Sequence, residues 1–108
     1  MPTNLIVARM APESSGAVAK IFEKFDQSDM PEQMGTKRRQ LFHYKGLYFH
    51  LQEFEEDGSA RIETAKTDPR FIQISSDLKP FIGAFDPATW KSPADAMATP
   101  FYNWEGSA

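Results

Sequence analysis

The spacing of hydrophobic positions changes along the chain, and each change marks an expected element. Residues 4–10 form a short apolar run that stops at Ala11 and Pro12, as a buried strand does. From Ala17 to Phe25, apolar residues recur at helical spacing, and Ser14 or Ser15 can cap the helix. The chain is therefore predicted to open with a strand and an amphipathic helix.

Two aromatic, β-friendly runs follow, at residues 37–44 and 47–54. Only Lys45 and Gly46 separate them, and this spacing predicts a two-residue hairpin turn. Pairing of Tyr44 with Leu47 across the turn fixes the register of the whole hairpin.

This register sorts the hairpin side chains onto two faces. Arg39 and His50 fall on one face as diagonal neighbours, with backbones about 7–8 Å apart. Neither face is plainly polar, so we expect a second subunit to cover one of them, or one of them to line a cavity. The first face holds Arg39, Leu41, His43, Tyr48, His50 and Gln52, and the other holds Gln40, Phe42, Tyr44, Leu47, Phe49 and Leu51.

The remaining segments complete the pattern. Residues 27–36 contain Pro31 and Gly35 without periodicity and predict a loop. Helices are expected at residues 59–66 and from Asp68-Pro69 to about Leu78, where Pro80 interrupts. An aromatic strand is expected at residues 99–104. The order βαββαβ predicts an α+β, ferredoxin-like fold over residues 1–108 as one domain, with an antiparallel sheet and both helices on one face.

Composition narrows the functional classes. The net charge is -3, and no basic block extends beyond residues 37–39, so no nucleic-acid partner is expected. The chain has no Cys, which excludes disulfides, thiolate metal sites and Cys nucleophiles. No stretch approaches the roughly 18 apolar residues of a membrane span and the start does not resemble a signal peptide, so we expect no membrane partner and a cytoplasmic location.

Arg39 and His50 form the candidate catalytic pair. A histidine that moves a proton near neutral pH, beside a permanent cation, suits enolisation of a carbonyl compound and stabilisation of the oxyanion. The alternative from spacing alone is a hydrogen-bonded core histidine and a strand-surface cation. Asp26, which closes the first helix, is the third catalytic candidate, because it could orient His50 or offset the charge of Arg39. A carboxylate at the C-terminal end of a helix faces an unfavourable dipole, so we expect a compensating cation nearby, and Arg39 is the candidate.

Metal and ligand binding involve a further set of side chains. With two histidines in all, and His43 expected in solvent near the turn, we expect no metal and no cofactor. Core packing explains most of the large apolar residues, but some of them suit the walls of a site for a flat aromatic ligand. The candidate pocket residues are Phe22, Phe25, Met30, Met34, Leu41, Trp90, Phe101 and Trp104.

Several stretches carry a family resemblance. They include residues 5–10 (Leu-Ile-Val-Ala-Arg-Met), 34–42 (Met-Gly-Thr-Lys-Arg-Arg-Gln-Leu-Phe), 46–51 (Gly-Leu-Tyr-Phe-His-Leu) and 101–104 (Phe-Tyr-Asn-Trp). On these residues the chain resembles the tetracenomycin-type aromatic polyketide cyclases of bacterial type II polyketide biosynthesis, over nearly its whole length.

The resemblance implies a homodimer of the dimeric α/β-barrel type, acting on a partly cyclised poly-β-ketone by aldol condensation and loss of water. It also implies possible docking with components of the type II polyketide synthase. The family's proposed pocket residues fall on Asp26, Arg39 and His50. Where family members can have His-Asp at the end of the first helix, this chain has Phe25-Asp26, which removes one possible proton carrier.

Two other functions share these features. A cofactor-independent quinone-forming monooxygenase has the same ferredoxin-like dimer. A non-catalytic protein could instead bind the polyketide as a template while it cyclises spontaneously.

Overall fold

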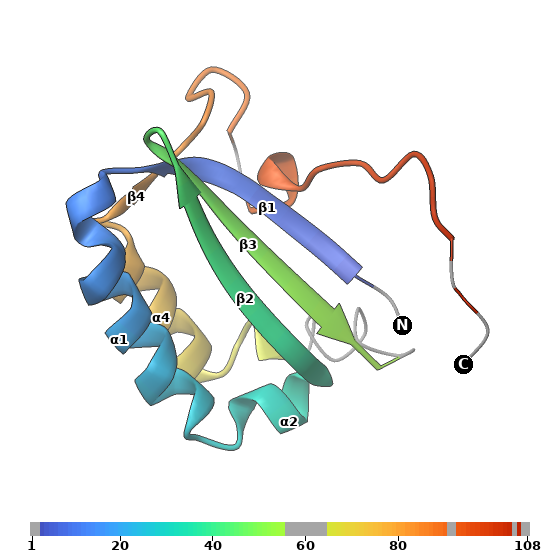
Figure 1. Cartoon of the computed structure of the whole chain (residues 1–108). Coiled ribbons are helices and arrows are strands. Elements are labelled where there is room, and N and C mark those ends of the chain that lie inside the picture. Colours follow the sequence, from blue (N-terminus) through green and yellow to red (C-terminus); the bar gives the residue numbers. More distant parts are fainter. Residues whose placement is uncertain (1–2, 56–64, 91–92, 105, 107–108) are drawn as a thin grey trace.

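The computed structural model describes residues 3–55, 65–90, 93–104 and 106 (Figure 1). Three long strands form most of the sheet, and the helices lie beside them. The elements are β1 (Thr3–Met10), the 3-10 helix η1 (Pro12–Ser14), α1 (Ser15–Asp26), α2 (Met30–Met34), β2 (Thr36–Tyr44), β3 (Leu47–Phe54), α4 (Pro69–Leu78), β4 (Ile82–Gly83) and the 3-10 helix η2 (Pro93–Ala96).

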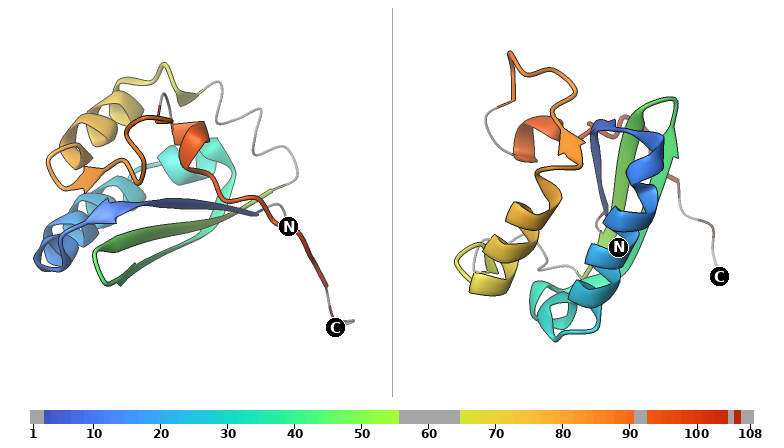
Figure 2. Two further views of the ribbon diagram at one scale, coloured as in Figure 1. Left: turned by 90° about the horizontal axis from the view of Figure 1, so that it is seen from above. Right: turned by 90° about the vertical axis from the view of Figure 1, so that its left-hand side faces the viewer.

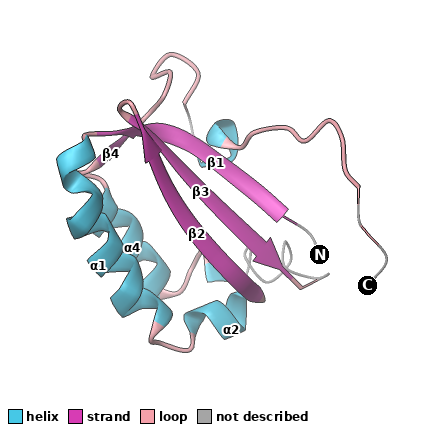
Figure 3. Ribbon diagram, in the orientation of Figure 1, coloured by secondary structure: helices cyan, strands magenta, loops and turns pink. Residues whose placement is uncertain are grey.

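The sheet has the order β2-β3-β1-β4, and all neighbouring strands are antiparallel. Both α1 and α4 lie on the same side of the sheet, and no described helix covers the other side (Figures 2 and 3). This arrangement confirms the predicted ferredoxin-like fold. No described helix has the length and hydropathy needed to cross a membrane.

The hairpin adopts the predicted register. Tyr44 pairs with Leu47 and Leu41 with His50. Lys45 and Gly46 both have positive φ, 48° and 81°, as a turn of the I′ type requires. The turn therefore sets which side chains of both strands face the helices.

Along β3, burial alternates with every residue. Tyr48, His50 and Gln52 are buried under the helices, whereas Leu47 and Phe49 are only half-buried on the uncovered face. All described helices pack on one side, so the other face has no helical cover within this chain, and its cover by a second subunit stays a prediction.

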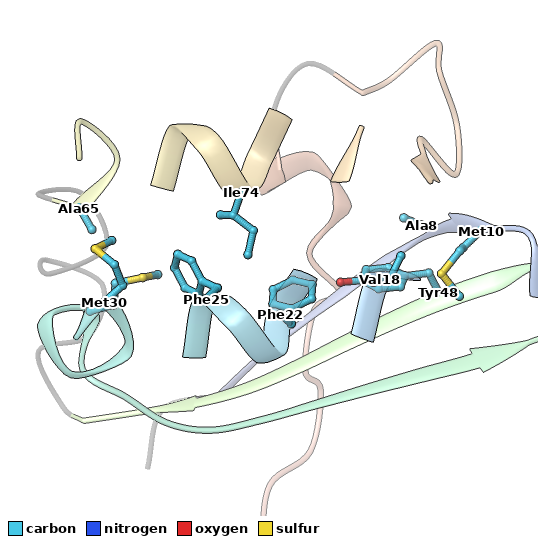
Figure 4. Packing of buried hydrophobic residues seen from close by; sticks show 10 residues of the cluster. Ala8, Met10, Val18, Phe22, Phe25, Met30, Tyr48, Ala65 and Ile74 are labelled. Carbon is cyan, nitrogen blue, oxygen red and sulfur yellow. The ribbon is translucent and has the colours of Figure 1, made fainter. Parts of the chain in front are cut away.

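The core lies between the sheet and α1, α2 and α4. Val18, Phe22 and Phe25 project from α1 toward Ile74 of α4 and Tyr48 of β3 (Figure 4). Burial of each such side chain stabilises the fold by about 1.5–3 kcal/mol. This packing fixes α1 over the hairpin, which matters for the site.

The predicted loop at residues 27–36 contains a helix, α2. Pro31 stands in its first turn, where a missing N–H costs nothing, and Gly35 ends it in the left-handed conformation at φ 73°. The absence of periodicity reflects the length of α2, which is too short to show a repeat.

The second helical region is partly confirmed. Asp68 caps α4, and its side chain accepts a hydrogen bond from the Arg70 backbone N–H at 2.8 Å. The helix ends at Leu78, just before Pro80. The helix predicted at residues 59–66 lies almost wholly outside the described residues.

The predicted strand at residues 99–104 is wrong. Among the described residues the last strand is β4, which pairs with Arg9 and Met10 of β1. Further along the same edge, Met97 bridges Ile6. These segments already occupy the outer edge of β1, and Pro100 has no N–H to donate to a ladder, so the chain leaves the sheet here.

Candidate functional site

Arg39 of β2 and His50 of β3 meet beneath α1, on the helix-covered face. The pairing of Leu41 with His50 and of Arg39 with Gln52 makes Arg39 and His50 diagonal neighbours, as the hairpin register predicts. Arg39 Nη1 lies 2.8 Å from His50 Nε2. Because a guanidinium has no acceptor, Arg39 donates this hydrogen bond, and the neutral imidazole carries its proton on Nδ1.

Asp26 holds the other side of the same guanidinium. Arg39 Nε donates to both Asp26 carboxylate oxygens at 3.1 Å, and Nη2 lies 3.0 Å from Oδ1. The Arg39 side chain is only 8% exposed, whereas that of Asp26 is 37% exposed. The cation expected at the C-terminal end of α1 is therefore present, and the carboxylate stays in contact with water.

Two aromatic rings from α1 enclose the Arg39–His50 pair. The Phe22 ring meets the His50 ring edge-on, with centroids 5.1 Å apart. The Arg39 guanidinium lies 4.9 Å from the Phe22 centroid and 5.7 Å from that of Phe25. These contacts are close enough for cation–π attraction and keep bulk water away from the pair.

Burial makes His50 a weak base in this state. Desolvation lowers the pKa of His50 to about 3, and the positive charge of Arg39 adds to the effect. The imidazole is therefore neutral near pH 7. Burial also raises the pKa of the neighbouring Tyr48, partly offset by Arg39, so its hydroxyl stays protonated.

One atom of Arg39 retains donor capacity. Nη2 is buried and has no hydrogen-bond partner among the described residues, although it stands near Asp26 Oδ1. Its N–H groups are not aligned with that carboxylate oxygen. A guanidinium held in this way, with unused N–H donors, is suited to bind a carbonyl oxygen or an enolate.

The predicted pocket residues differ in how far they are buried, and they do not all lie around one cavity. Leu41 and Trp90 are half-buried and pack against the core. Phe101 is 99% exposed and Trp104 is 76% exposed, so neither lines a cavity within this chain. The residues that are buried in the core are Phe22, Phe25, Met30 and Met34.

Arg39 and His50 do not line either of two hollows found among the described residues. One, of about 500 Å³, is polar and lies beside Gly35, Thr36 and Lys37. The other, of about 150 Å³, lies between α1 and the hairpin, with Leu41 and Tyr48 in its wall. In this state the Arg39–His50 pair is closed over by α1.

Tyr48 and Gln52 lie beside the Arg39–His50 pair but were not among the predicted site residues. Both are polar, buried and adjacent to His50 along the same face of β3. The Tyr48 and His50 ring centroids are 6.2 Å apart. The alternation of β3 had already placed both on this face, so the register could have identified them.

His43 lies exposed near the turn, as expected. Among the described residues, no group of three or more His, Asp or Glu side chains could hold a metal ion.

The fold places the chain in the class of small α+β proteins with the ferredoxin-like arrangement, and the buried Arg39–His50 pair marks its candidate site. A family model for polyketide synthesis cyclases matches residues 2–105. The chain belongs to the polyketide synthesis cyclase family.

Three relatives from Streptomyces support this assignment. An uncharacterized protein of Streptomyces coelicolor is 45% identical over 97% of this chain and 96% of its own length. Polyketide synthase CurG of Streptomyces cyaneus is 36% identical, covering 94% of each chain. Tetracenomycin F2 cyclase of Streptomyces glaucescens is 31% identical over 93% of this chain and 91% of its own.

Solved structures agree with the fold. The structure of tetracenomycin F2 cyclase from Streptomyces glaucescens, a type-II polyketide cyclase, superposes with a TM-score of 0.90 at 29% identity, covering 99% of this chain and 100% of that one. A putative antibiotic biosynthesis monooxygenase from Caulobacter crescentus has a TM-score of 0.58 at 14% identity, over 74% of this chain and 76% of its own. The second likeness shows the fold alone.

Proposed function

We propose that this polyketide cyclase closes a ring of a partly cyclised aromatic poly-β-ketone by intramolecular aldol condensation followed by loss of water. The observation that carries the proposal is the buried Arg39 guanidinium, which is held by Asp26 and His50 and keeps unused donors at Nη2. Such a cation stabilises the negative charge that develops on a ketone oxygen during enolisation.

The proposal assigns a residue to each step of the reaction. A methylene between two ketones loses a proton readily, so the site mainly folds the chain and favours one enolate. Arg39 turns its N–H groups to the ketone oxygen, which frees His50 Nε2 to take the methylene proton. The enolate stabilises the imidazolium that burial otherwise disfavours.

In the later steps His50 gives back the proton that it took from the methylene. The enolate carbon bonds to the carbonyl carbon of a second ketone, and His50 returns the proton to the new alkoxide. Loss of that hydroxyl with a neighbouring ring hydrogen releases water and leaves the double bond. Asp26 orients Arg39 throughout, and the Phe22 and Phe25 rings limit how the substrate folds.

The same proposal includes a homodimer formed through the uncovered face of the sheet. Phe42 and Tyr44 are 38% and 60% exposed there, beside the half-buried Phe49. An apolar surface on the sheet layer is typical of an interface. A second copy is the proposed occupant because all described helices lie on the other side of the sheet and leave these aromatic side chains without cover.

Light scattering tests the dimer. Phe42→Glu is expected to give a monomer at concentrations where the wild type is a dimer. Ile72→Glu is the matched control, since Ile72 is 57% exposed on α4, in the other layer. A monomeric wild type, or equal effects of the two variants, would contradict the interface.

The reaction is tested with the purified protein and candidate partly cyclised poly-β-ketones. Products are identified by mass spectrometry and NMR and compared with those formed without protein. Arg39→Met and His50→Ala are expected to reduce ring closure strongly. Rates within a few-fold of wild type for both variants would discard acid–base catalysis and leave templating. Uptake of oxygen during the reaction would point to a monooxygenase instead.

A further inference from the structure

A small apolar groove lies at the turn end of the hairpin. It has a volume of about 150 Å³ and is open at the surface between α1 and the two strands. Val18 and Ala19 form its α1 side, and Leu41 and Tyr48 form its floor. His43 also lines the groove and is exposed.

The groove adjoins the Arg39–His50 pair. Its floor and that pair share one face of the hairpin, because Leu41 pairs directly with His50. Residues that alternate along one face of a strand lie about 6.6 Å apart. Tyr48, which belongs to the groove, is therefore the next residue from His50 on that face.

The α1 side of the groove is also next to the Arg39–His50 pair. Val18 and Ala19 lie one turn before Phe22, which covers His50. Residues three and four apart share one face of a helix. Helix α1 and the hairpin thus form two adjoining sites. One is the covered Arg39–His50 pair, and the other is the open apolar groove.

We propose that this groove binds one aromatic ring of the polyketide, while the part of the substrate that reacts lies against Arg39 and His50. This inference rests on the proposed function and adds the position of the substrate. An apolar cavity of about 150 Å³ is large enough to bind benzene. It is smaller than the roughly 300–1,000 Å³ of sites that enclose a whole drug-sized ligand, so the groove takes an end of the substrate. His43 offers a ring nitrogen to a hydroxyl or ketone oxygen on that ring.

Filling the groove tests the proposal. Ala19→Leu places a larger side chain at the groove wall, and Ala19→Met is a second, more flexible filler. Ala17→Leu is the matched control, because Ala17 is exposed on the same helix and does not line the groove. Circular dichroism establishes that all three variants fold.

Naphthol is the binding probe, because it is a flat phenol without the reactive ketones of the substrate. In NMR titrations it is expected to shift signals of Val18, Ala19 and Leu41. Both Ala19 variants should weaken its binding about tenfold or more, as blocked hydrophobic pockets do, while Ala17→Leu binds as wild type. NMR shifts confined to other parts of the protein, or equal naphthol binding by Ala19→Leu and Ala17→Leu, would overturn the proposal that the groove binds an aromatic ring.

The polyketide reaction separates the two proposals. With an accepted poly-β-ketone, Ala19→Leu should raise KM or change the product ratio, and His43→Leu should raise KM. If the wild type closes the ring and the Ala19 variants behave as wild type, the groove assignment fails and the proposed function stands. If no polyketide is cyclised beyond the rate without protein, the proposed function fails, and the substrate assignment fails with it.

Discussion

His50 Nε2 accepts a hydrogen bond from Arg39 Nη1 at 2.8 Å, so the histidine orients the arginine in the closed state. Its lone pair becomes available to a substrate proton only when Arg39 turns away. This relationship makes the two residues one unit, because movement of either changes what the other can do.

Replacement of Arg39 is the first test of this coupling. Arg39→Met should lower kcat by about 10²–10³, the usual cost of losing one oxyanion donor. His50→Gln should also lower kcat, since an amide cannot carry the proton. The double variant should lose much less than the product of the two single losses, because the residues act together.

Kinetics with a polyketide substrate measure all three variants. Arg39→Lys is the control for charge alone, since an ammonium cannot contact Asp26 and His50 through a planar fork. If the fall in kcat of the double variant equals the product of the two single falls, Arg39 and His50 act independently.

The buried His50 also makes stability depend on pH. Burial holds the folded pKa of His50 at about 3, below the ordinary histidine value of 6.5. Between these values the unfolded state binds more protons than the folded state, so stability falls as pH decreases. The slope from this group is at most about 1.4 kcal/mol per pH unit. His50→Gln should therefore show a flatter dependence from pH 6.5 down toward pH 4.

Urea unfolding at a series of pH values measures this difference. His43→Gln is the matched control, because His43 is exposed. Parallel curves for wild type and His50→Gln would mean that His50 is more accessible to protons than its burial indicates.

The hairpin shows how much of the site the sequence contained. Lys45 and Gly46 fix the register, and the period of two in a strand then places Arg39 and His50 on one face. The contact of Asp26 with Arg39 followed from the helix dipole, since a carboxylate at a C-terminal end requires a cation. Local rules were sufficient here because turn and pairing partners are close in sequence.

Elements that depend on distant partners were not predictable in this way. Residues 99–104 have strand-like composition, yet the edge of β1 is taken by β4, which spans two residues and shows no pattern of its own. Closure of Phe22 over Arg39 also depends on how α1 packs across the sheet. Neither feature is encoded by the spacing of residues along one segment.

The hairpin turn gives a stability prediction. Gly46 has φ 81°, and a Cβ there would meet no atom within 4 Å, so any penalty is one of backbone conformation. Gly46→Ala should destabilise the fold by about 1–2 kcal/mol. Gly16→Ala, in α1 and equally free of contacts, should instead stabilise by about 0.5–1 kcal/mol. Urea unfolding measures both changes, and a loss of stability in both variants would contradict the backbone explanation.

Arg70 gives a prediction for acid stability. It donates to Asp68 and to Asp29, and these hydrogen bonds lower the pKa of each carboxyl below the usual 3.8. For a depressed carboxyl pKa, the stabilisation is present above the unfolded value and is lost as pH falls through the folded value. Arg70→Met should therefore be less stable near neutral pH and should lose less additional stability between pH 4 and pH 2. Arg38→Met, which removes a more exposed cation 3.5 Å from Glu53, is the control. Urea unfolding from pH 7 to pH 2 makes the comparison, and identical pH profiles for Arg70→Met and wild type would show that the two carboxyls do not depend on Arg70.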